Sequence, residues 1–598
     1  MDKKKIEIKF RTDPVTVSVI ESALFAVTGE MTITLFRTSR SPILVEAKDF
    51  GCAITNEKGE IVSVSAGLPI HTMGLDFSVR ACLQYFGDEI YPGDVYFVND
   101  PHKPFYASGH TPDFVTLVPV FYQNELVFWS IERGHQADTG APVPGGLNMS
   151  ARTEFDEGMR VTPVKLYEKG KLRRDLWDLI FRNLRLKTMI AGDLHSAIGS
   201  VKTGEKRLLE LIDKYGFDTV KNGTQDMLEY SEALMRDRLS KFKDGTYSAE
   251  RQLDGDAAGG PYKIVAKVTK KGDSLTIDYT GTDPQSGAVC NTNLSNTYGA
   301  TSIAVFMTIG RGLPSCSGTM KPIKIIAPEG TMVNPLSPAS TVVGTLHPYN
   351  EVIAAVKDCL SNLDPQKSIA DWSRATGIIV AGIDSRNGEM FSGIEFHSGG
   401  GAGGNWGADG WHNANYNCSA LGGQAEEHEL YEIFYPHTLL YHRLWNDSGG
   451  PGKWRGGLGV EYAWKAETIS GEAVLAPYAD GMFTTIQGLL GGKGPLGEAE
   501  YGDAYLIKAD GTKVDTRRKT AYYYESGDTL YYRGNGGAGI GNPFERDPES
   551  VRLDVMNDLV SIKSAKDNYG VFFKEGKWPF EIDIEATKQA REKMTSKK

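Results

Sequence analysis

The sequence predicts the α+β fold class: a multidomain mixed α/β chain with a helical middle segment and a Gly- and aromatic-rich, β-dominated C-terminal part. Three observations support this. The chain has 598 residues, enough for roughly three or four domain-sized units. Residues 175–239 contain no proline and repeat apolar clusters at helical spacing. The last third instead concentrates its glycines in tight runs between aromatic segments.

These changes of pattern divide the chain into four expected domains. They are residues 1–172, an N-terminal α+β domain with a hairpin of candidate metal ligands; 173–243, a helical segment; 244–395, a second α+β domain; and 396–598, a Gly/aromatic-rich β-dominated domain.

The N-terminal part begins with a helix predicted over 13–40, because Asp13 is a good N-cap and Pro14 suits the first helical position. A hairpin of two short strands, a helix and a further strand follow at 51–54, 61–64, 77–86 and 95–98.

Farther along, residues 175–239 predict two or three packed helices. The expected strands are at 262–268, 275–279, 521–525 and 530–533, and the expected helices are at 300–309, 352–360 and 584–598.

Composition excludes several classes of protein. The net charge is −11 and no basic stripe is present, so nucleic acid is not expected as a partner. No window approaches the apolar length that spans a bilayer, and the charged N-terminus has no apolar core of a secretory signal behind it. The six cysteines are scattered without CxxC pairs, which favours a reducing, cytoplasmic compartment.

Residues 99–135 carry the strongest chemical signal. Two apolar runs, 114–122 and 126–131, predict a β-hairpin. His110 and Asp113 precede the first run, and His135 follows the second. Positions at the open end of an antiparallel pair are neighbours in space, so these three side chains can converge. Two imidazoles and a carboxylate suit zinc, iron or manganese, although isolated residues of these types are most often hydrogen-bonded structure.

Other catalytic motifs are absent from the sequence or lack the structural context that they need. No GxxxxGK[ST] P-loop is present, and the nearest GxGxxG-like run, 534–541, lacks a strand–helix context. If ATP is used, another chain is therefore expected to hold it. Residues 446–451 resemble a serine-protease nucleophile loop, but they continue into a structural turn. Five histidines crowd the C-terminal part, where a cluster could handle protons: His397, His412, His428, His437 and His442.

An ordered series of motifs then resembles the hydantoinase B/oxoprolinase family, which includes the corresponding subunits of acetone and acetophenone carboxylases. The motifs are Asp-Pro-Val at 13–15, Asp-Phe-Gly-Cys-Ala at 49–53, Pro-Ile-His at 69–71, Pro-Gly-Asp-Val at 92–95, Asn-Asp-Pro at 99–101, His-Thr-Pro-Asp at 110–113, Gly-Thr-Asp-Pro-Gln at 281–285, Asp-Ser-Gly-Gly at 447–450, Arg-Gly-Gly at 455–457, Gly-Gly-Ala-Gly at 536–539 and Tyr-Gly-Val at 569–571.

The resemblance implies a site residue by residue. It places one divalent transition metal (Zn, Fe or Mn) on His110, Asp113 and His135, with Asp49 as a fourth ligand. It also singles out His71 and Asp100, from the Pro-Ile-His and Asn-Asp-Pro motifs, as candidate catalytic residues.

The resemblance also implies a heteromeric, ATP-dependent enzyme. A hydantoinase A-like partner would bind ATP and Mg and phosphorylate an oxygen, after which the metal subunit would complete the reaction on a ketone or a cyclic amide. A small extra subunit is a further partner left open. No nucleic acid and no membrane are expected as partners.

We expect a ketone carboxylase of the acetophenone/acetone type, acting on a phosphate-activated enolate with bicarbonate-derived CO2. The loop 102–109 departs from the usual glycine-rich form, and 406–412 looks more like the ketone carboxylases. The aromatics Phe105, Tyr106, Trp406 and Trp411 can line an apolar pocket or be ordinary core. The alternatives are a hydantoinase, oxoprolinase or lactamase subunit that hydrolyses a cyclic amide, and a non-catalytic scaffold.

Overall fold

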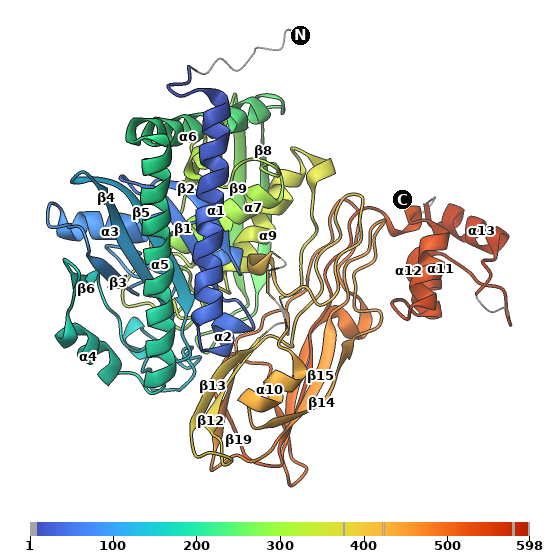
Figure 1. Ribbon diagram of the computed structural model, residues 1–598. Coiled ribbons are helices and arrows are strands. Elements are labelled where there is room, and N and C mark those ends of the chain that lie inside the picture. Colours follow the sequence, from blue (N-terminus) through green and yellow to red (C-terminus); the bar gives the residue numbers. More distant parts are fainter. Residues whose placement is uncertain (1–8, 375–376, 421, 424, 577–579, 596–598) are drawn as a thin grey trace.

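The computed structural model describes residues 9–374, 377–420, 422–423, 425–576 and 580–595. The described residues form a multidomain α+β protein, as predicted, with four sheets and helices packed around them (Figure 1). The four-way division of the chain proposed from the sequence stays a prediction.

The first sheet is antiparallel and has the order β2-β1-β5-β4-β3-β6-β7. Its strands are β1 (Phe50–Asn56), β2 (Ile61–Ala66), β3 (Val95–Val98), β4 (Asp113–Tyr122), β5 (Glu125–His135), β6 (Val164–Glu168) and β7 (Lys171–Leu172). The predicted hairpin is confirmed: β4 and β5 pair with each other at the centre of this sheet.

Helices cover both faces of this sheet. On one face α1 (Pro14–Thr38) packs beside α5 (Lys187–Tyr215) and α6 (Phe217–Ser240), and Figure 1 shows α1 and α5 lying side by side. On the other face α3 (Asp76–Phe86) packs over Trp129 and Ile131 of β5. The helical middle segment is therefore three helices, α4 (Arg174–Arg182), α5 and α6.

Helix α1 departs from one expectation. Asp13 caps it as predicted, its carboxylate accepting a hydrogen bond from Thr16 N. However, α1 is long and apolar enough, by length and composition, to cross a membrane. The expectation that no window approaches that length was therefore wrong. In the structure Ile20, Leu24 and Met31 of α1 are fully buried against the sheet and the neighbouring helices.

The second sheet, β11-β10-β9-β8, contains β8 (Gly245–Leu253), β9 (Tyr262–Lys271), β10 (Ser274–Asp278) and β11 (Ile323–Ile326). Helices α7 (Leu294–Met307) and α9 (Tyr349–Ser361) pack against it in the largest apolar core. Both helices occur where helices were predicted, although each begins several residues earlier.

Two further antiparallel sheets form the lower part of Figure 1. One contains β12 (Ile378–Ile383), β13 (Met390–Glu395), β16 (Ala473–Pro477) and β19 (Tyr522–Tyr524). The other contains β14 (His437–Leu444), β15 (Val460–Ala466), β17 (Asp503–Ile507), β18 (Lys513–Asp515) and β20 (Thr529–Arg533). Short helices also lie along the chain between the elements given above: α2 (Pro42–Val45), α8 (Ser317–Met320) and α10 (His428–Phe434).

The glycine runs pack backbone against backbone, as predicted. A Cβ on Gly401 would lie 1.9 Å from the carbonyl oxygen of Gly457, and one on Gly456 would lie 1.9 Å from that of Gly537. Only glycine allows this approach.

The chain then ends in three helices set apart in Figure 1: α11 (Pro548–Met556), α12 (Ile562–Tyr569) and α13 (Ile584–Thr595). Of these three helices only α13 was expected from the sequence, although Asp547 and Ser561 are the N-caps of α11 and α12.

Candidate metal centre

The hairpin brings the three predicted ligands together. Asp113 is the first residue of β4, His135 is the last residue of β5, and the register pairs them directly. His110 lies in the turn before β4, where Asp113 N donates to His110 O at 3.1 Å. Gly109 permits this turn, because a Cβ there would lie 2.8 Å from Thr345 Cγ2 and 2.9 Å from Asp113 Oδ2.

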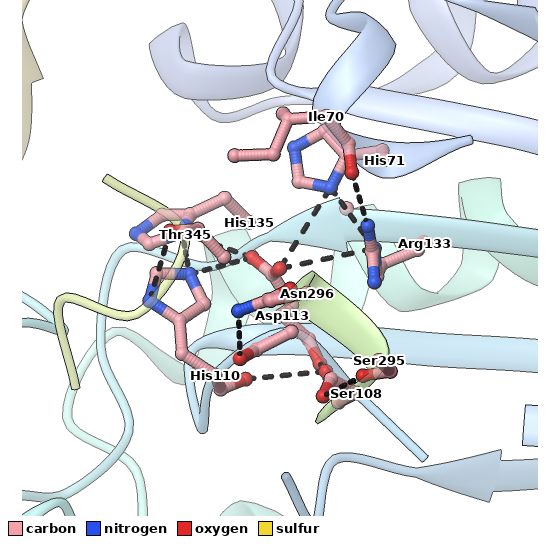
Figure 2. A network of polar contacts seen from close by, with 12 residues as sticks. Ile70, His71, Ser108, His110, Asp113, Arg133, His135, Ser295, Asn296 and Thr345 are labelled. Carbon is pink, nitrogen blue, oxygen red and sulfur yellow. Dashed lines mark hydrogen bonds and ion pairs between the residues drawn. The ribbon is translucent and has the colours of Figure 1, made fainter. Parts of the chain in front are cut away.

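Three donor atoms meet at one point, as Figure 2 shows. His110 Nε2 lies 2.8 Å from Asp113 Oδ1 and 3.0 Å from His135 Nδ1. His135 Nδ1 lies 3.2 Å from the same carboxylate oxygen. All three side chains are buried. Ligands at right angles around a metal about 2.1 Å away are about 3.0 Å apart, so this spacing matches a set of adjacent ligands.

The surroundings of His110 orient its ring for this role. Its Nδ1 lies 2.7 Å from the carbonyl oxygen of Val342, so Nδ1 carries the hydrogen and donates it. The lone pair of Nε2 is then directed at Asp113 and His135. A ligating histidine commonly holds its other nitrogen against a backbone carbonyl in this way.

The pKa values of the group show strong electrostatic coupling. Burial alone would raise the pKa of Asp113, but the imidazoles of His110 and His71 hold it well below its usual range. Burial would lower the pKa of His110, but the Asp113 carboxylate outweighs this effect and the pKa is raised overall. The site therefore holds an ionised carboxylate, which attracts positive charge.

Asp49 and His71, also singled out from the sequence, lie beside this group. His71 Nε2 is 2.5 Å from Asp49 Oδ1. Arg133 Nε donates to His71 Nδ1 at 3.1 Å, so the hydrogen of the His71 ring is on Nε2 and faces Asp49. The potential ligand atoms that lie close together belong to His110, Asp113 and His135. Asp49 lies outside this group and is hydrogen-bonded to His71 instead.

An enclosed cavity of about 20 Å³ adjoins these residues, enough for one water molecule or one ion. Its lining includes the three donors and the following residues: Asp49, Leu68, Ile70, His71, Leu147, Thr345, Leu346, Ile394, Tyr416 and Tyr478. Burial raises the pKa of Tyr416 and of Tyr478 well above its usual value, so both hydroxyls stay protonated.

Asp100 does not line this cavity. Its Oδ1 accepts a hydrogen bond from His102 N at 3.0 Å, in a separate polar group that includes Glu154. The four aromatics that could line an apolar pocket or be ordinary core are also outside this cavity. Phe105 packs against Tyr85, Trp406 packs against Trp454, and Trp411 is 67% exposed. Tyr106 is buried, and its hydroxyl donates to Asn334 Oδ1 at 3.2 Å.

Sequence reasoning missed several contributors. Arg133 had a local signal, since it is two residues before His135 and strand alternation places both on one face. Tyr416, Tyr478 and the Val342 carbonyl reach the site from segments more than 200 residues away, and no local pattern marks them.

The donor set fits a divalent metal. It consists of two buried imidazoles and a buried carboxylate, which are ligands that divalent transition metals accept. The metal's identity is not fixed by this donor set, since zinc, iron and manganese all accept it.

Fold and site together define a multidomain α+β protein with a buried metal-competent group. The chain belongs to the hydantoinase B/oxoprolinase family, whose sequence model matches residues 13–543. It is 32% identical to the caprolactamase subunit beta of Pseudomonas jessenii, over 94% of this chain and 96% of that one. It is 26% identical to the acetophenone carboxylase delta subunit of Aromatoleum aromaticum, over 91% and 84%.

A solved structure agrees with these relationships. The crystal structure of ATP-dependent caprolactamase from Pseudomonas jessenii has a TM-score of 0.87 at 31% identity and covers 97% of this chain and 100% of that one. The family recognised from the sequence motifs is thus confirmed, and the chain is a hydantoinase B-type enzyme subunit of the ATP-dependent amide hydrolases or carboxylases. The comparisons do not specifically favour the carboxylase that we expected.

Proposed function

We propose that this chain is the metal-bearing subunit of an ATP-dependent hydrolase that opens a cyclic amide, in partnership with a hydantoinase A-like subunit that binds ATP. The convergence of His110, Asp113 and His135 beside an enclosed cavity is the observation that carries the catalytic part. The choice of a cyclic amide rests on the greater identity to the caprolactamase subunit than to the carboxylase subunit.

The three donors would hold a divalent cation, and Asp49 would join them as a fourth ligand by exchanging its contact with His71. Such a cation, when bound, polarises a carbonyl or lowers the pKa of a water. Asp113 supplies the negative charge that retains it, and the Val342 carbonyl keeps the His110 lone pair directed inward.

The other lining residues would position the substrate and carry protons. His71 holds a hydrogen at Nε2, oriented by Arg133, and can pass it to the leaving nitrogen of a ring-opened amide. The protonated hydroxyls of Tyr416 and Tyr478 can donate to a substrate oxygen. Leu68, Ile70 and other apolar lining residues exclude bulk water.

ATP would act from the companion subunit. The sequence has no P-loop, and the relatives are named as subunits, which supports a complex with at least one other chain. Phosphorylation of the amide oxygen there would activate the carbonyl carbon. Addition of water to that carbon at this site would then expel the ring nitrogen, which takes up a proton, and hydrolysis of the resulting acyl phosphate would release the acid and phosphate.

The test is an assay of the complex reconstituted with its ATP-binding partner. ATP hydrolysis is measured with a lactam or hydantoin without bicarbonate, and separately with acetone or acetophenone plus bicarbonate. We expect amide-dependent turnover that His110→Ala abolishes and that the control His195→Ala, on exposed α5 surface, leaves unchanged. Turnover only with a ketone and bicarbonate would contradict the substrate class. Turnover unaffected by His110→Ala would favour a scaffold.

A further inference from the structure

A second group of histidines lies in the C-terminal part, away from the residues used above. His397 follows β13, His428 is the first residue of α10, and His442 is on β14. Their ring centroids are 5.3, 5.2 and 5.1 Å apart, so the three imidazoles form a nearly equilateral triangle. One nitrogen from each ring lies within 4.8 Å of the others.

Several nitrogens of this histidine triangle lack partners. His428 Nε2 and His442 Nδ1 are 2.9 Å apart, so at most one hydrogen can lie between them. Both nitrogens of His397, which is fully buried, and Nε2 of His442 have no hydrogen-bond partner among the described residues. A buried polar atom without a partner costs about 1–3 kcal/mol. Unpartnered nitrogens on two of the three rings indicate that a compensating group belongs there.

We propose that His397, His428 and His442 form a second metal site, which takes a divalent transition metal of the Zn²⁺ class and ties α10 to the sheets. Three neutral imidazoles are a sufficient donor set for zinc, with the fourth position open. His428 is exposed and His442 is half-buried, so the open position faces solvent and a cation can enter.

A carboxylate stands behind the histidine triangle. Glu426 Oε2 lies 3.4 Å from His397 Nδ1, and the Glu426 carboxylate accepts from Phe396 N at 2.9 and 3.1 Å. A carboxylate on one ring nitrogen fixes the histidine so that its other nitrogen faces the metal. This geometry assigns Nε2 of His397 to the cation.

A third group of potential ligands differs from the histidine triangle because cationic side chains already balance its charge. His347, Glu351 and Asp480 are also close together and buried. Arg374 lies 3.3 Å from Glu351, and Lys519 lies 3.4 Å from Asp480, so two cationic side chains already balance these carboxylates. The histidine triangle has no such cation within ion-pair distance among the described residues, and its charge balance leaves room for a metal.

The proposed site joins three segments that are distant in sequence. His397 lies two residues after the end of β13. Ile394, which is on this strand, lines the cavity described above. A metal held there would fasten the start of α10 to β13 and β14. We therefore expect it to stabilise the fold rather than to contact substrate.

The experiment is a Zn²⁺ titration of the full chain after dialysis against a chelator. Bound zinc is counted by mass spectrometry, and thermal unfolding is followed at each zinc concentration. The double variant His428→Ala/His442→Ala should bind one equivalent fewer than the wild type and should lose part of the zinc-induced rise in melting temperature. The control His195→Ala, which also removes one exposed histidine, should behave as the wild type.

A cluster variant that binds as much zinc as the wild type would overturn the proposal. Because a double variant can misfold, the single change His428→Ala at the exposed position is measured in parallel, with circular dichroism confirming its fold. It should weaken zinc binding by at least about tenfold, and an unchanged affinity would likewise overturn the site. The measured quantity is the difference in bound zinc between the variant and the wild type. It therefore does not depend on whether His110, Asp113 and His135 bind metal.

Discussion

The carboxylate of Asp193 offers a quantitative test of how the N-terminal part is held together. Asp193 is on α5 and is 1% exposed. Its Oδ1 accepts from Arg40 N at 2.6 Å and from Ser41 N at 3.2 Å, which fixes the chain just before α2 and the segment that leads to Asp49. Its Oδ2 is buried without a hydrogen-bond partner among the described residues. Replacement by Asn keeps the accepting oxygen and removes the ionisable one.

Burial raises the pKa of Asp193 from 3.8 to about 6. A carboxyl whose pKa is raised by folding stabilises the protein fully below the unfolded value, and this contribution is lost as pH rises through the folded value. A shift of about two units corresponds to about 3 kcal/mol. The free energy of unfolding of Asp193→Asn should therefore exceed that of the wild type by only about 0.5 kcal/mol near about pH 4 and by about 3 kcal/mol above about pH 7.

The assay is urea unfolding followed by tryptophan fluorescence between about pH 4 and about pH 8. The quantity of interest is the difference between variant and wild type at each pH, because carboxylates that do not interact with Asp193 titrate equally in both. Glu132 is the exception, since burial and then the Asp193 charge raise its pKa. A difference that does not change with pH, or a variant less stable than the wild type at neutral pH, would refute the reasoning.

Three further predictions concern the candidate metal centre. Asp49→Asn should weaken metal affinity by about 10–100-fold without abolishing binding, measured by titration; unchanged affinity would remove Asp49 from the ligand set. Gly377→Ala should lower both the melting temperature and turnover, because the φ of Gly377 is +96° and a Cβ there would lie 1.7 Å from Tyr478 Cζ. A wild-type melting temperature and wild-type turnover would show that the position of Tyr478 does not matter for the reaction. Arg133→Met removes the donor to His71 and should reduce turnover together with stability, by about 1.5–3 kcal/mol in urea unfolding; a fully active, equally stable variant would refute the role given to Arg133.

Much of the fold was predictable where signals are local. Asp13 and Pro14 predicted the start of α1, and the alternating apolar runs predicted β4 and β5 closely enough to place their ends together. The convergence of His110, Asp113 and His135 followed from that register alone. Helices α11 and α12 were missed although their caps are local, because the glycine-rich background dominated the interpretation of the last third.

The remaining parts of the site depend on tertiary contacts. Tyr416 and Tyr478 reach the cavity from residues outside the helices and strands, Tyr478 directly after β16, and His397, His428 and His442 come from three separate segments. The spacing of these residues along the chain does not show that they come close together in the folded protein. The contact between Asp49 and His71 was likewise not anticipated, since both were singled out by motif rather than by geometry.

The central claim is that His110, Asp113 and His135 hold a single cation. Crystals of the chain grown with Zn²⁺ or Mn²⁺ and measured at the metal absorption edge test it most directly. The account predicts an anomalous peak about 2.0–2.2 Å from His110 Nε2, His135 Nδ1 and Asp113 Oδ1. A map with metal peaks elsewhere on the chain and none among these three atoms would contradict it.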